Sequence, residues 1–238
     1  NRNRAGNKMN NPDLSYQVAI DGPAAAGKST AARLLAEKLG GFYVNTGDMY
    51  RALAWAARQN GIDPEKNPEA LTALLPGWEL RYRLLDDRTL QLFFNGQPIS
   101  QDKLRAPEVT AIVSQVARIP EVREWMLERQ RECSSLGVII MEGRDIGTVI
   151  LPQAKFKFFI TASPMERARR RLAQSGEVAA DATLAKVAAE IEARDHIDST
   201  RETAPLKPAP DAITLVTDGM NQEQVANHLA EIIKKSLT

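Results

Sequence analysis

The chain has 238 residues, of which 43% are hydrophobic and 26% charged, a composition typical of one large globular domain or one domain with an insertion. Its 31 basic and 30 acidic side chains give a net charge of +1, which excludes binding to nucleic acid or a membrane surface through bulk charge. A single cysteine, Cys133, excludes an intramolecular disulfide, and two histidines leave no spacing for a zinc site.

The beginning of the chain has no pattern of a folded element. Residues 1–15 are polar without a hydrophobic period, and we expect a disordered extension or a remnant of expression cloning. No apolar run reaches the ~18 residues of a membrane-spanning helix, and no secretory signal is evident. We therefore expect a cytoplasmic protein whose domain covers residues 16–238.

The first part of the domain alternates between strand and helix signals. Residues 17–21 form a short apolar run that ends in a carboxylate and predicts a strand. A loop with glycines follows, and then an Ala- and Leu-rich stretch predicts a helix that stops at Gly40. Residues 42–45 predict a second strand, and residues 49–60 predict a helix that ends at Gly61.

A stretch at about 62–136 is too long for one loop in a compact domain, so it predicts an insertion. Within it, residues 78–84 and 90–95 alternate like the strands of a hairpin. Residues 107–135 have a helical period that Pro120 interrupts. We therefore expect a small antiparallel hairpin and helices beside the core.

Strand and helix signals alternate again in the last part of the chain. Apolar runs at 138–141, 156–160 and 213–216 predict buried strands, and residues 222–235 predict a closing amphipathic helix. Residues 204–211 are proline-rich and predict a loop. Alternating strands and helices favour an α/β fold with a parallel sheet and helices on both faces.

The helix after the strand at 156–160 has distinct start signals. Ser163 is a predicted N-cap, Pro164 fits the first helical position, and Glu166 is placed to close a capping box.

Residues 22–29 read GPAAAGKS and match the phosphate-binding pattern GxxxxGK[ST] at every fixed position. The match lies between a predicted strand and a predicted helix, as the motif requires. Backbone N–H groups would surround an anion, Lys28 would reach the outer phosphates, and Ser29 would ligate magnesium. A chance glycine turn is the alternative to a nucleotide site formed by Gly22, Pro23, Ala24, Ala25, Ala26, Gly27, Lys28, Ser29 and Thr30.

A phosphate-binding loop does not define the reaction, but other motifs narrow it. No NKxD segment is present to read guanine, and motor or transporter ATPases are normally larger. TGDMYR at 46–51 and EGRD at 142–145 follow predicted strands, where open α/β sheets bind ligands. Arg194, Asp198 and Arg201 are spaced to share one helix face. Such arginines favour phosphoryl transfer to an anionic acceptor, and a solvated charged surface is the alternative.

The ordered combination of TGDMYR, SQVA with PEVRE, EGRDIGTVILPQA and RDHIDSTRETAPLKPA resembles bacterial cytidylate kinases, from about residue 17 to the closing helix. The resemblance implies a P-loop nucleoside-monophosphate-kinase fold with a five-stranded parallel core. It also implies transfer of phosphate from ATP to CMP or dCMP with Mg²⁺. The implied parts are a core at 16–61 and 137–238, a monophosphate-binding insertion at about 62–136, and a mobile lid at about 174–203.

The resemblance also implies roles for single residues. Arg51, Arg144 and Arg201 match arginines that hold the CMP phosphate or the transferring group, while Arg194 and Asp198 match positions near the ribose and the lid. Cytosine would be read by Ser114, Arg123 and Asp145, since a carboxylate accepts from the N4 amino group and the other two donate to ring acceptors. The implied CMP-binding set also includes Thr46 and Tyr50, and the implied catalytic set is Lys28, Arg144, Arg194 and Arg201.

The implied magnesium site consists of Ser29, which would ligate the ion directly, and Glu142, which would act through water. Glu142 stands where many members have aspartate, and His196 and Ile197 replace a more charged pair in the lid. We expect a monomer that binds ATP and CMP or dCMP but neither nucleic acid nor membrane.

Several alternatives stay open at this point. The chain could be a P-loop kinase for UMP or a non-nucleotide acid, or an ATP-dependent switch. A basic run contributes either contacts to ATP or solvated helix surface; it comprises Arg167, Arg169, Arg170 and Arg171. Cys133 has no histidine nearby in the sequence, which predicts an unreactive thiol.

Overall fold

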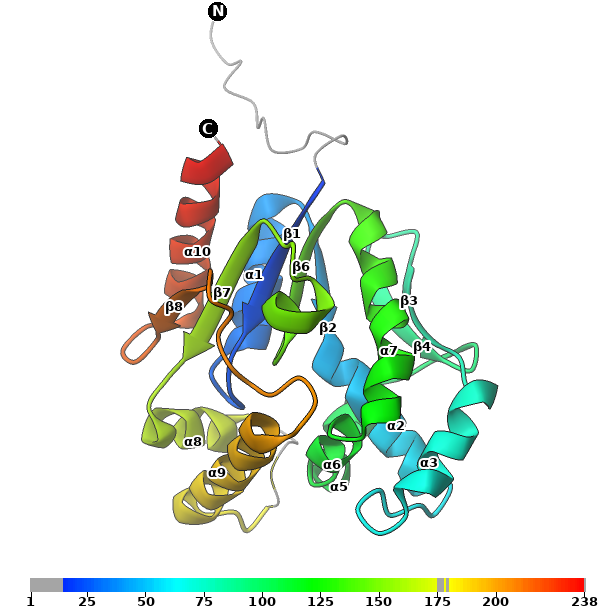
Figure 1. Ribbon diagram of the computed structural model, residues 1–238. Coiled ribbons are helices and arrows are strands. Elements are labelled where there is room, and N and C mark those ends of the chain that lie inside the picture. The colour runs from blue at the N-terminus through cyan, green and yellow to red at the C-terminus, as the bar shows by residue number, and fades with distance from the viewer. Residues whose placement is uncertain (1–14, 175–177, 179, 238) are drawn as a thin grey trace, which may run out of the picture.

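The computed structural model describes residues 15–174, 178 and 180–237, and a five-stranded parallel sheet lies at its centre (Figure 1). The strand order is β2-β6-β1-β7-β8, and every pairing in this sheet is parallel, which confirms the predicted α/β fold. The predicted extension at 1–15 lies outside the described residues except for Ser15. The strands are β1 (Tyr16–Asp21), β2 (Phe42–Asn45), β6 (Val138–Gly143), β7 (Phe156–Thr161) and β8 (Ile213–Val216).

Helical segments cover both faces of the sheet, as predicted, because β1 buries side chains on both sides. Val18 and Ile20 pack in one cluster with α1 (Lys28–Leu39) and α10 (Gln222–Leu237). Ala19 belongs to the cluster on the opposite face, which includes Cys133 and the short helix Ile146–Ile150. The central strands are therefore an inner layer that is packed on both sides. The prediction of a buried strand at 213–216 is wrong, because β8 is an edge strand that leaves Ile213 and Val216 exposed.

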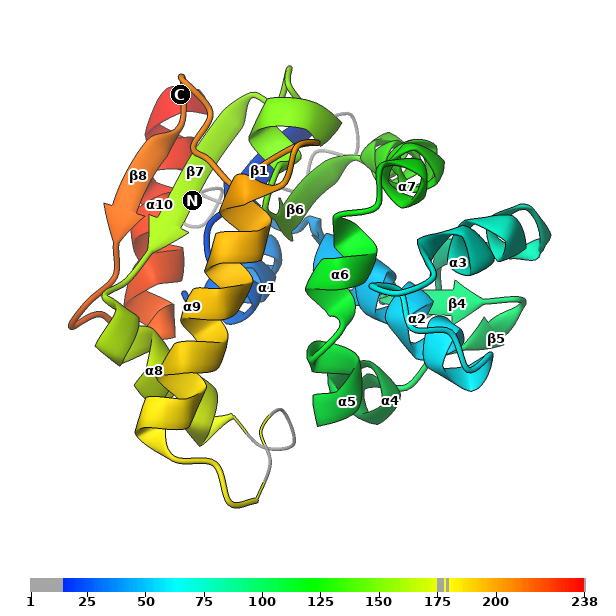
Figure 2. The same cartoon turned by 60° about the horizontal axis from the view of Figure 1, so that its bottom comes forward.

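A second hydrophobic core is built around α2 (Thr46–Gln59). Figure 2 shows α2 beside the sheet, among the helices and strands of the insertion. The Ala- and Leu-rich face of α2 packs there against apolar side chains of the insertion. The site described below lies between this second core and the core of the sheet. The other elements of the insertion are α3 (Pro68–Leu74), β3 (Leu80–Leu84), β4 (Leu90–Phe94), β5 (Gln97–Pro98), α4 (Gln101–Arg105), α5 (Pro107–Thr110), α6 (Val113–Ala117) and α7 (Pro120–Glu132).

The predicted hairpin is confirmed by the antiparallel pairing of β3 with β4, in which Leu80 lies opposite Phe94 and Leu84 opposite Leu90. A third strand, β5, pairs with β4 and was not predicted. Two residues are too few to carry an alternating pattern, and one of them is Pro98.

Two helix boundaries differ from the sequence prediction. Helix α2 begins at Thr46 rather than at residue 49, because the Asn45 side chain accepts a hydrogen bond from the Asp48 N–H and acts as the N-cap. The helical stretch 107–135 has a second interruption near Ala111, besides the one before Pro120. Packing of each short helix into the second core overrides the continuous period of the sequence.

Helix α8 (Pro164–Ala173) begins where predicted, and the Ser163 side chain accepts a hydrogen bond from the Glu166 N–H. The second half of the predicted capping box is wrong. The Asp218 carboxylate accepts from the Ser163 N–H at 2.9 Å, while Glu166 pairs with Arg170 at 3.0 Å. A residue distant in the chain thus completes the cap.

Helix α9 (Leu184–Thr200) follows α8 and packs beside it. Arg194 and Asp198 lie on this helix, but Arg201 lies one residue beyond its end. Residues 175–177 and 179 of the predicted lid lie outside the described residues. The proline-rich loop after α9 leads into β8 as predicted.

Gly22 allows the chain to turn directly after β1. Its φ is +149°, and an added Cβ would lie 1.9 Å from the carbonyl oxygen of Ile160. We expect Gly22→Ala to lower the free energy of unfolding by about 3 kcal/mol or more. Gly219 is the matched control, since its φ is +76° with open space around it, and Gly219→Ala should cost only ~1 kcal/mol. Urea unfolding followed by circular dichroism measures both, and equal losses would contradict the steric argument.

Candidate active site

The predicted phosphate-binding loop joins β1 to α1, with glycines at its sharp turns. Gly27 has a φ of +87° and is the N-cap of α1, so the positive end of the helix dipole faces the loop. The Lys28 ammonium donates to the Pro23 carbonyl oxygen at 2.6 Å. Burial and the neighbouring Arg144 hold the pKa of Lys28 well below its ordinary value. An anionic ligand in this loop would favour the charged ammonium.

Side chains at the ends of β2 and β6 form the wall beside this loop. Thr46 Oγ1 donates to the backbone carbonyl of Glu142 at 2.7 Å, and the Tyr43 hydroxyl donates to the Glu142 carboxylate at 2.6 Å. Burial and the carboxylate raise the pKa of Tyr43 well above its ordinary value, so the phenol keeps this proton. The contacts hold Glu142 at the pocket that also contains Lys28 and Ser29.

The pocket over the phosphate-binding loop, here called the loop pocket, is lined by residues 25–30, by Glu142 and by arginines from five parts of the chain. Arg51 is anchored there by donating to the Leu104 carbonyl oxygen at 3.0 Å and to Thr110 Oγ1 at 2.6 Å. The structure thus brings together residues from the predicted core, insertion and lid segments. The arginines are Arg51, Arg105, Arg144, Arg171 and Arg194.

A second pocket, here called the inner pocket, adjoins the loop pocket and shares Gly47, Gly143, Arg144 and Arg194 with it. All predicted CMP-binding residues except Arg51 line the inner pocket. The chain folds so that α2, the end of β6, the insertion and α9 each supply part of this lining. These residues are Thr46, Tyr50, Ser114, Arg123, Arg144, Asp145, Arg194, Asp198 and Arg201.

Charged side chains alternate in sign across the inner pocket. Arg123 pairs with Asp145 Oδ2, and Arg201 lies 3.9 Å from Asp145 Oδ1 and 3.8 Å from Asp198 Oδ1. The Arg144 Nε donates to Asp198 Oδ2 at 2.9 Å. With Arg194, four arginines face two aspartates in this lining, so two positive charges have no counter-charge within it.

The arginines determine the ionisation of Asp198. Burial favours its neutral form, but Arg144, Arg194 and Arg201 outweigh burial and hold the pKa of Asp198 below its ordinary value. Burial and the like charge of Arg144 lower the pKa of Arg194. The pocket therefore concentrates buried positive charge, which is unfavourable in free energy, and a bound anion would offset this free energy.

Four buried polar atoms of residues that line the inner pocket have no hydrogen-bond partner within the part of the chain that the structure describes. They are Tyr50 Oη, Ser114 Oγ, Arg194 Nε and Arg201 Nη2. An unpaired buried polar group costs about 1–3 kcal/mol, so such groups are uncommon in folded proteins. Their position in one pocket indicates a polar ligand.

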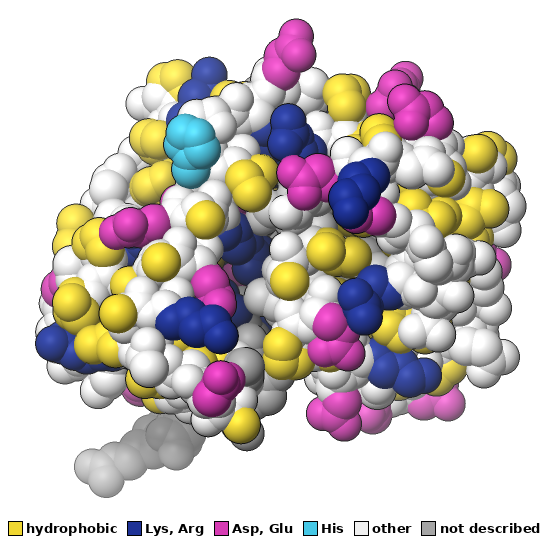
Figure 3. All heavy atoms as spheres, turned by 90° about the horizontal axis from the view of Figure 1, so that it is seen from below, with side chains coloured by type: hydrophobic (Ala, Val, Ile, Leu, Met, Phe, Trp, Pro, Cys, Tyr) yellow, Lys and Arg dark blue, Asp and Glu magenta, His cyan; other side chains and the backbone are white. Residues whose placement is uncertain are grey.

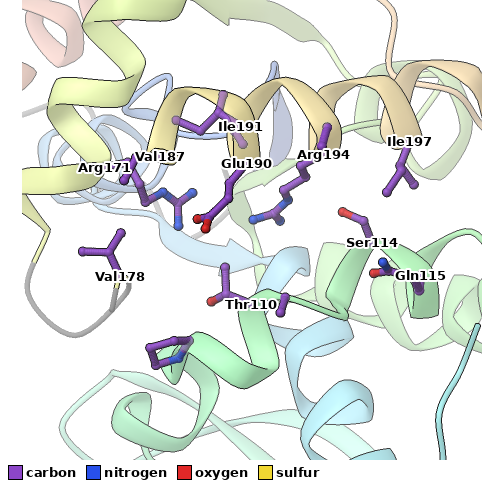
Figure 4. A pocket seen from close by; sticks show the side chains of 14 residues that line it. Thr110, Ser114, Gln115, Arg171, Val178, Val187, Glu190, Ile191, Arg194 and Ile197 are labelled. Atoms are coloured by element: carbon purple, nitrogen blue, oxygen red, sulfur yellow. The ribbon is translucent and has the colours of Figure 1, made fainter. Parts of the chain in front are cut away.

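A cleft leads from the surface to both pockets. Figure 3 shows Lys or Arg side chains deep in the hollow between the two halves of the molecule. The outer cavity, of about 310 Å³, lies between α9 and the α5–α6 region, and Arg194 borders this cavity and both pockets. In Figure 4, Arg171, Glu190 and Arg194 point into it from one side and Thr110 from the other.

Sequence reasoning missed Arg105, which reaches the loop pocket from α4 and pairs with Asp48 at 2.7 Å. No local pattern distinguishes it from a surface arginine. The structure also divides the basic run of α8. Arg171 lines the loop pocket, whereas Arg167 and Arg170 donate to the loop carbonyls of Ala24 and Ala26.

Cys133 is buried in the core of the sheet, and burial raises the pKa of its thiol to about 12. This agrees with the predicted lack of reactivity. At pH 8 we expect a thiol-specific disulfide reagent to react with the native protein at least ~100-fold more slowly than with the guanidinium-unfolded chain. Absorbance of the released thiolate measures both rates, and similar rates would show that the thiol is accessible.

Neither a membrane-spanning helix nor a metal-binding cluster of acidic, histidine and cysteine side chains occurs in the described ranges. None of the helices is long and apolar enough to cross a membrane. No group of three or more His, Cys, Asp or Glu side chains in these ranges could hold a metal ion.

Comparison with known proteins agrees with this geometry. The family model described as cytidylate kinase matches residues 18–235. A cytidylate kinase of Lactiplantibacillus plantarum is 44% identical over 93% of this chain and 96% of its own length. A bifunctional pantoate ligase/cytidylate kinase of Synechococcus sp. is 47% identical over 91% of this chain, which spans only 44% of that relative.

One solved structure, an uncharacterized protein from Eubacterium ventriosum, matches 93% of this chain and 99% of its own with a TM-score of 0.50. At 12% identity, this likeness concerns the fold alone. The match of the family model over most of the chain, together with the full-length relative, shows that the chain belongs to the cytidylate kinase family.

Proposed function

We propose that the chain transfers a phosphoryl group from ATP to CMP or dCMP, giving ADP and CDP or dCDP. The inner pocket carries this proposal, because it combines uncompensated positive charge with groups suited to cytosine. Asp145 would accept from the cytosine N4 amino group, while Ser114 and Arg123 would donate to its ring acceptors. Uracil would place a carbonyl oxygen against the Asp145 carboxylate instead.

The charge of the inner pocket supports a monophosphate acceptor. Its four arginines and two aspartates leave an excess of two positive charges, and a phosphate monoester carries about −1.5 to −2 at pH 7. Arg144 and Arg194 border both pockets, so they lie where a donor phosphate and an acceptor phosphate would meet.

In phosphoryl transfer, the protein contributes mainly by positioning the two nucleotides and by stabilising negative charge. The phosphate oxygen of CMP is already ionised near neutral pH, so it attacks without a general base. Lys28 and the loop N–H groups would hold the donor phosphates, while Arg144, Arg194 and Arg201 neutralise charge on the acceptor and the transferring group. Direct transfer needs no covalent enzyme intermediate.

The donors around the loop pocket fit magnesium. Ser29 and Glu142 offer hydroxyl and carboxylate oxygen, the ligand type that Mg²⁺ prefers, and nucleotide phosphates complete such sites. We propose that Ser29 ligates the ion and that Glu142 holds it through water. When bound, Mg²⁺ supplies charge stabilisation at the phosphates.

A coupled assay of ADP release with CMP, dCMP, UMP, AMP and shikimate tests the proposed function. Rapid turnover of CMP and dCMP alone is the expected result. Faster turnover of UMP or shikimate would support a different small-acceptor kinase. ATP binding without turnover of any acceptor would support a switch.

Cytoplasmic location, the monomeric state, the domain bounds and the lid stay predictions.

The role of Glu142 can be separated from its contact with Tyr43. Glu142→Gln keeps an oxygen for the Tyr43 hydroxyl but loses the charge, and we expect the Mg²⁺ concentration for half-maximal rate to rise ~10-fold or more. Tyr43→Phe is the matched control, because it removes the hydrogen bond that Glu142→Gln can retain and keeps the Glu142 carboxylate. Magnesium titrations of the rate compare the two. A defect of Glu142→Gln that excess metal does not relieve would assign Glu142 a structural role.

Base choice should depend on Asp145. The amide of Asp145→Asn can present either a donor or an acceptor to the base. We therefore expect this variant to lower kcat/KM for CMP more than for UMP, which changes the discrimination between the two substrates by about 1–3 kcal/mol. Arg144→Met is the control, because the proposed partner of Arg144 is phosphate. Arg144→Met should lower kcat/KM for both substrates and leave the ratio of the two values nearly unchanged. Values of kcat/KM for CMP and UMP decide, and equal losses in Asp145→Asn would remove Asp145 from base recognition.

A further inference from the structure

Asp21 is the last residue of β1 and is 3% exposed. Its carboxylate is hydrogen-bonded to the segment that follows β6, and Lys28 of the phosphate-binding loop is near enough to interact with its charge. Oδ1 accepts from the Ile146 N–H and Oδ2 from the Gly147 N–H, both at 2.8 Å. These two N–H groups begin the short helix Ile146–Ile150, directly after Arg144 and Asp145.

Asp145 occupies the N-cap position of that short helix, yet its side chain caps nothing. An aspartate at an N-cap ordinarily turns its carboxylate back to the first N–H groups of the helix, which otherwise lack partners. Here Asp21 satisfies two of them from another strand. The Asp145 carboxylate is therefore available to Arg123 and the inner pocket.

We propose that Asp21 is a positioning residue for base recognition: by capping the helix after Asp145, it keeps the Asp145 carboxylate in the inner pocket. The inference rests on the proposed function, since it names the support of the same base-reading group. Without the Asp21 carboxylate, two buried N–H groups lose their acceptors, and Asp145 is the adjacent carboxylate in the chain that can replace it. The base pocket would then lose its acceptor for the cytosine amino group.

Asp21→Asn tests this proposal, because an amide offers one acceptor oxygen and places its NH₂ against the other N–H donor. We expect the preference for CMP over UMP in kcat/KM to fall by about tenfold. The KM for ATP should change less. If Asp21 only shapes the phosphate-binding loop, the KM for ATP would rise and the CMP to UMP preference would stay the same.

A double-mutant cycle gives a sharper readout. If Asp21 acts through Asp145, the preference of the Asp21→Asn/Asp145→Asn variant should equal that of Asp145→Asn alone. If the double variant instead loses CMP to UMP preference by the product of the two single-variant losses, the proposal is overturned. Asp48→Asn is the matched control, since Asp48 is a buried carboxylate that binds Arg105 and Gln101 outside the inner pocket. Its CMP to UMP preference should remain that of the wild type.

Two further measurements keep the outcomes distinct. Circular dichroism and thermal unfolding establish that each variant is folded, and calorimetry with CMP and UMP measures binding without turnover. Asp21→Ser, whose hydroxyl can accept one N–H, serves if the amide variant does not fold; failure of both to fold would make Asp21 a stability residue and overturn the proposal. A wild-type protein that does not prefer CMP would refute the proposed function, whereas a wild-type preference that Asp21→Asn retains would refute only this inference.

Discussion

Buried positive charge is the constraint on which the rest of this site depends. Arginines taken out of water are costly unless carboxylates or a bound anion face them. In the inner pocket this compensation is partial, because two aspartates serve four arginines. Asp198 contacts Arg144 and Arg201, and Asp145 contacts Arg123 and Arg201. The protein thus holds its arginines in a defined arrangement while it leaves charge for an anionic substrate.

These charges meet because parallel strands end at the same edge of the sheet. The phosphate-binding loop follows β1, Thr46 follows β2, and Arg144 and Asp145 follow β6. The second core supplies the opposite wall, since α2 carries Arg51 and the insertion carries Ser114 and Arg123. Two packed cores with a polar seam between them give a cleft with rigid walls.

Helix α9 connects the two sides of the chemistry. Its Asp195 accepts from the Ala24 N–H of the phosphate-binding loop at 3.2 Å and pairs with Arg167 of α8. Arg194, the preceding residue, and Asp198, about one turn further along, line the inner pocket. One helix therefore contacts the sites proposed for donor and acceptor, so any displacement of α9 alters both.

Local sequence patterns were sufficient to predict many of the elements of this structure. The glycines and Lys28 of the phosphate-binding loop, the apolar strands and the hairpin at 78–95 follow from periods and turn residues within short segments. The arginines after the strands were also recognisable, and together with the family resemblance they identified every charged or hydroxyl-bearing residue of the inner pocket. Short-range order carries this information because strand and helix periods record which face is buried.

Pairing between distant residues was not recognisable in the same way. Asp218 rather than Glu166 completes the cap at Ser163, and Asp21 satisfies N–H groups 125 and 126 residues away in place of Asp145. Arg105 reaches the loop pocket from a five-residue helix. A carboxylate or guanidinium looks the same in sequence whether it meets water or a buried partner. Its partner depends on packing between segments that no local period records.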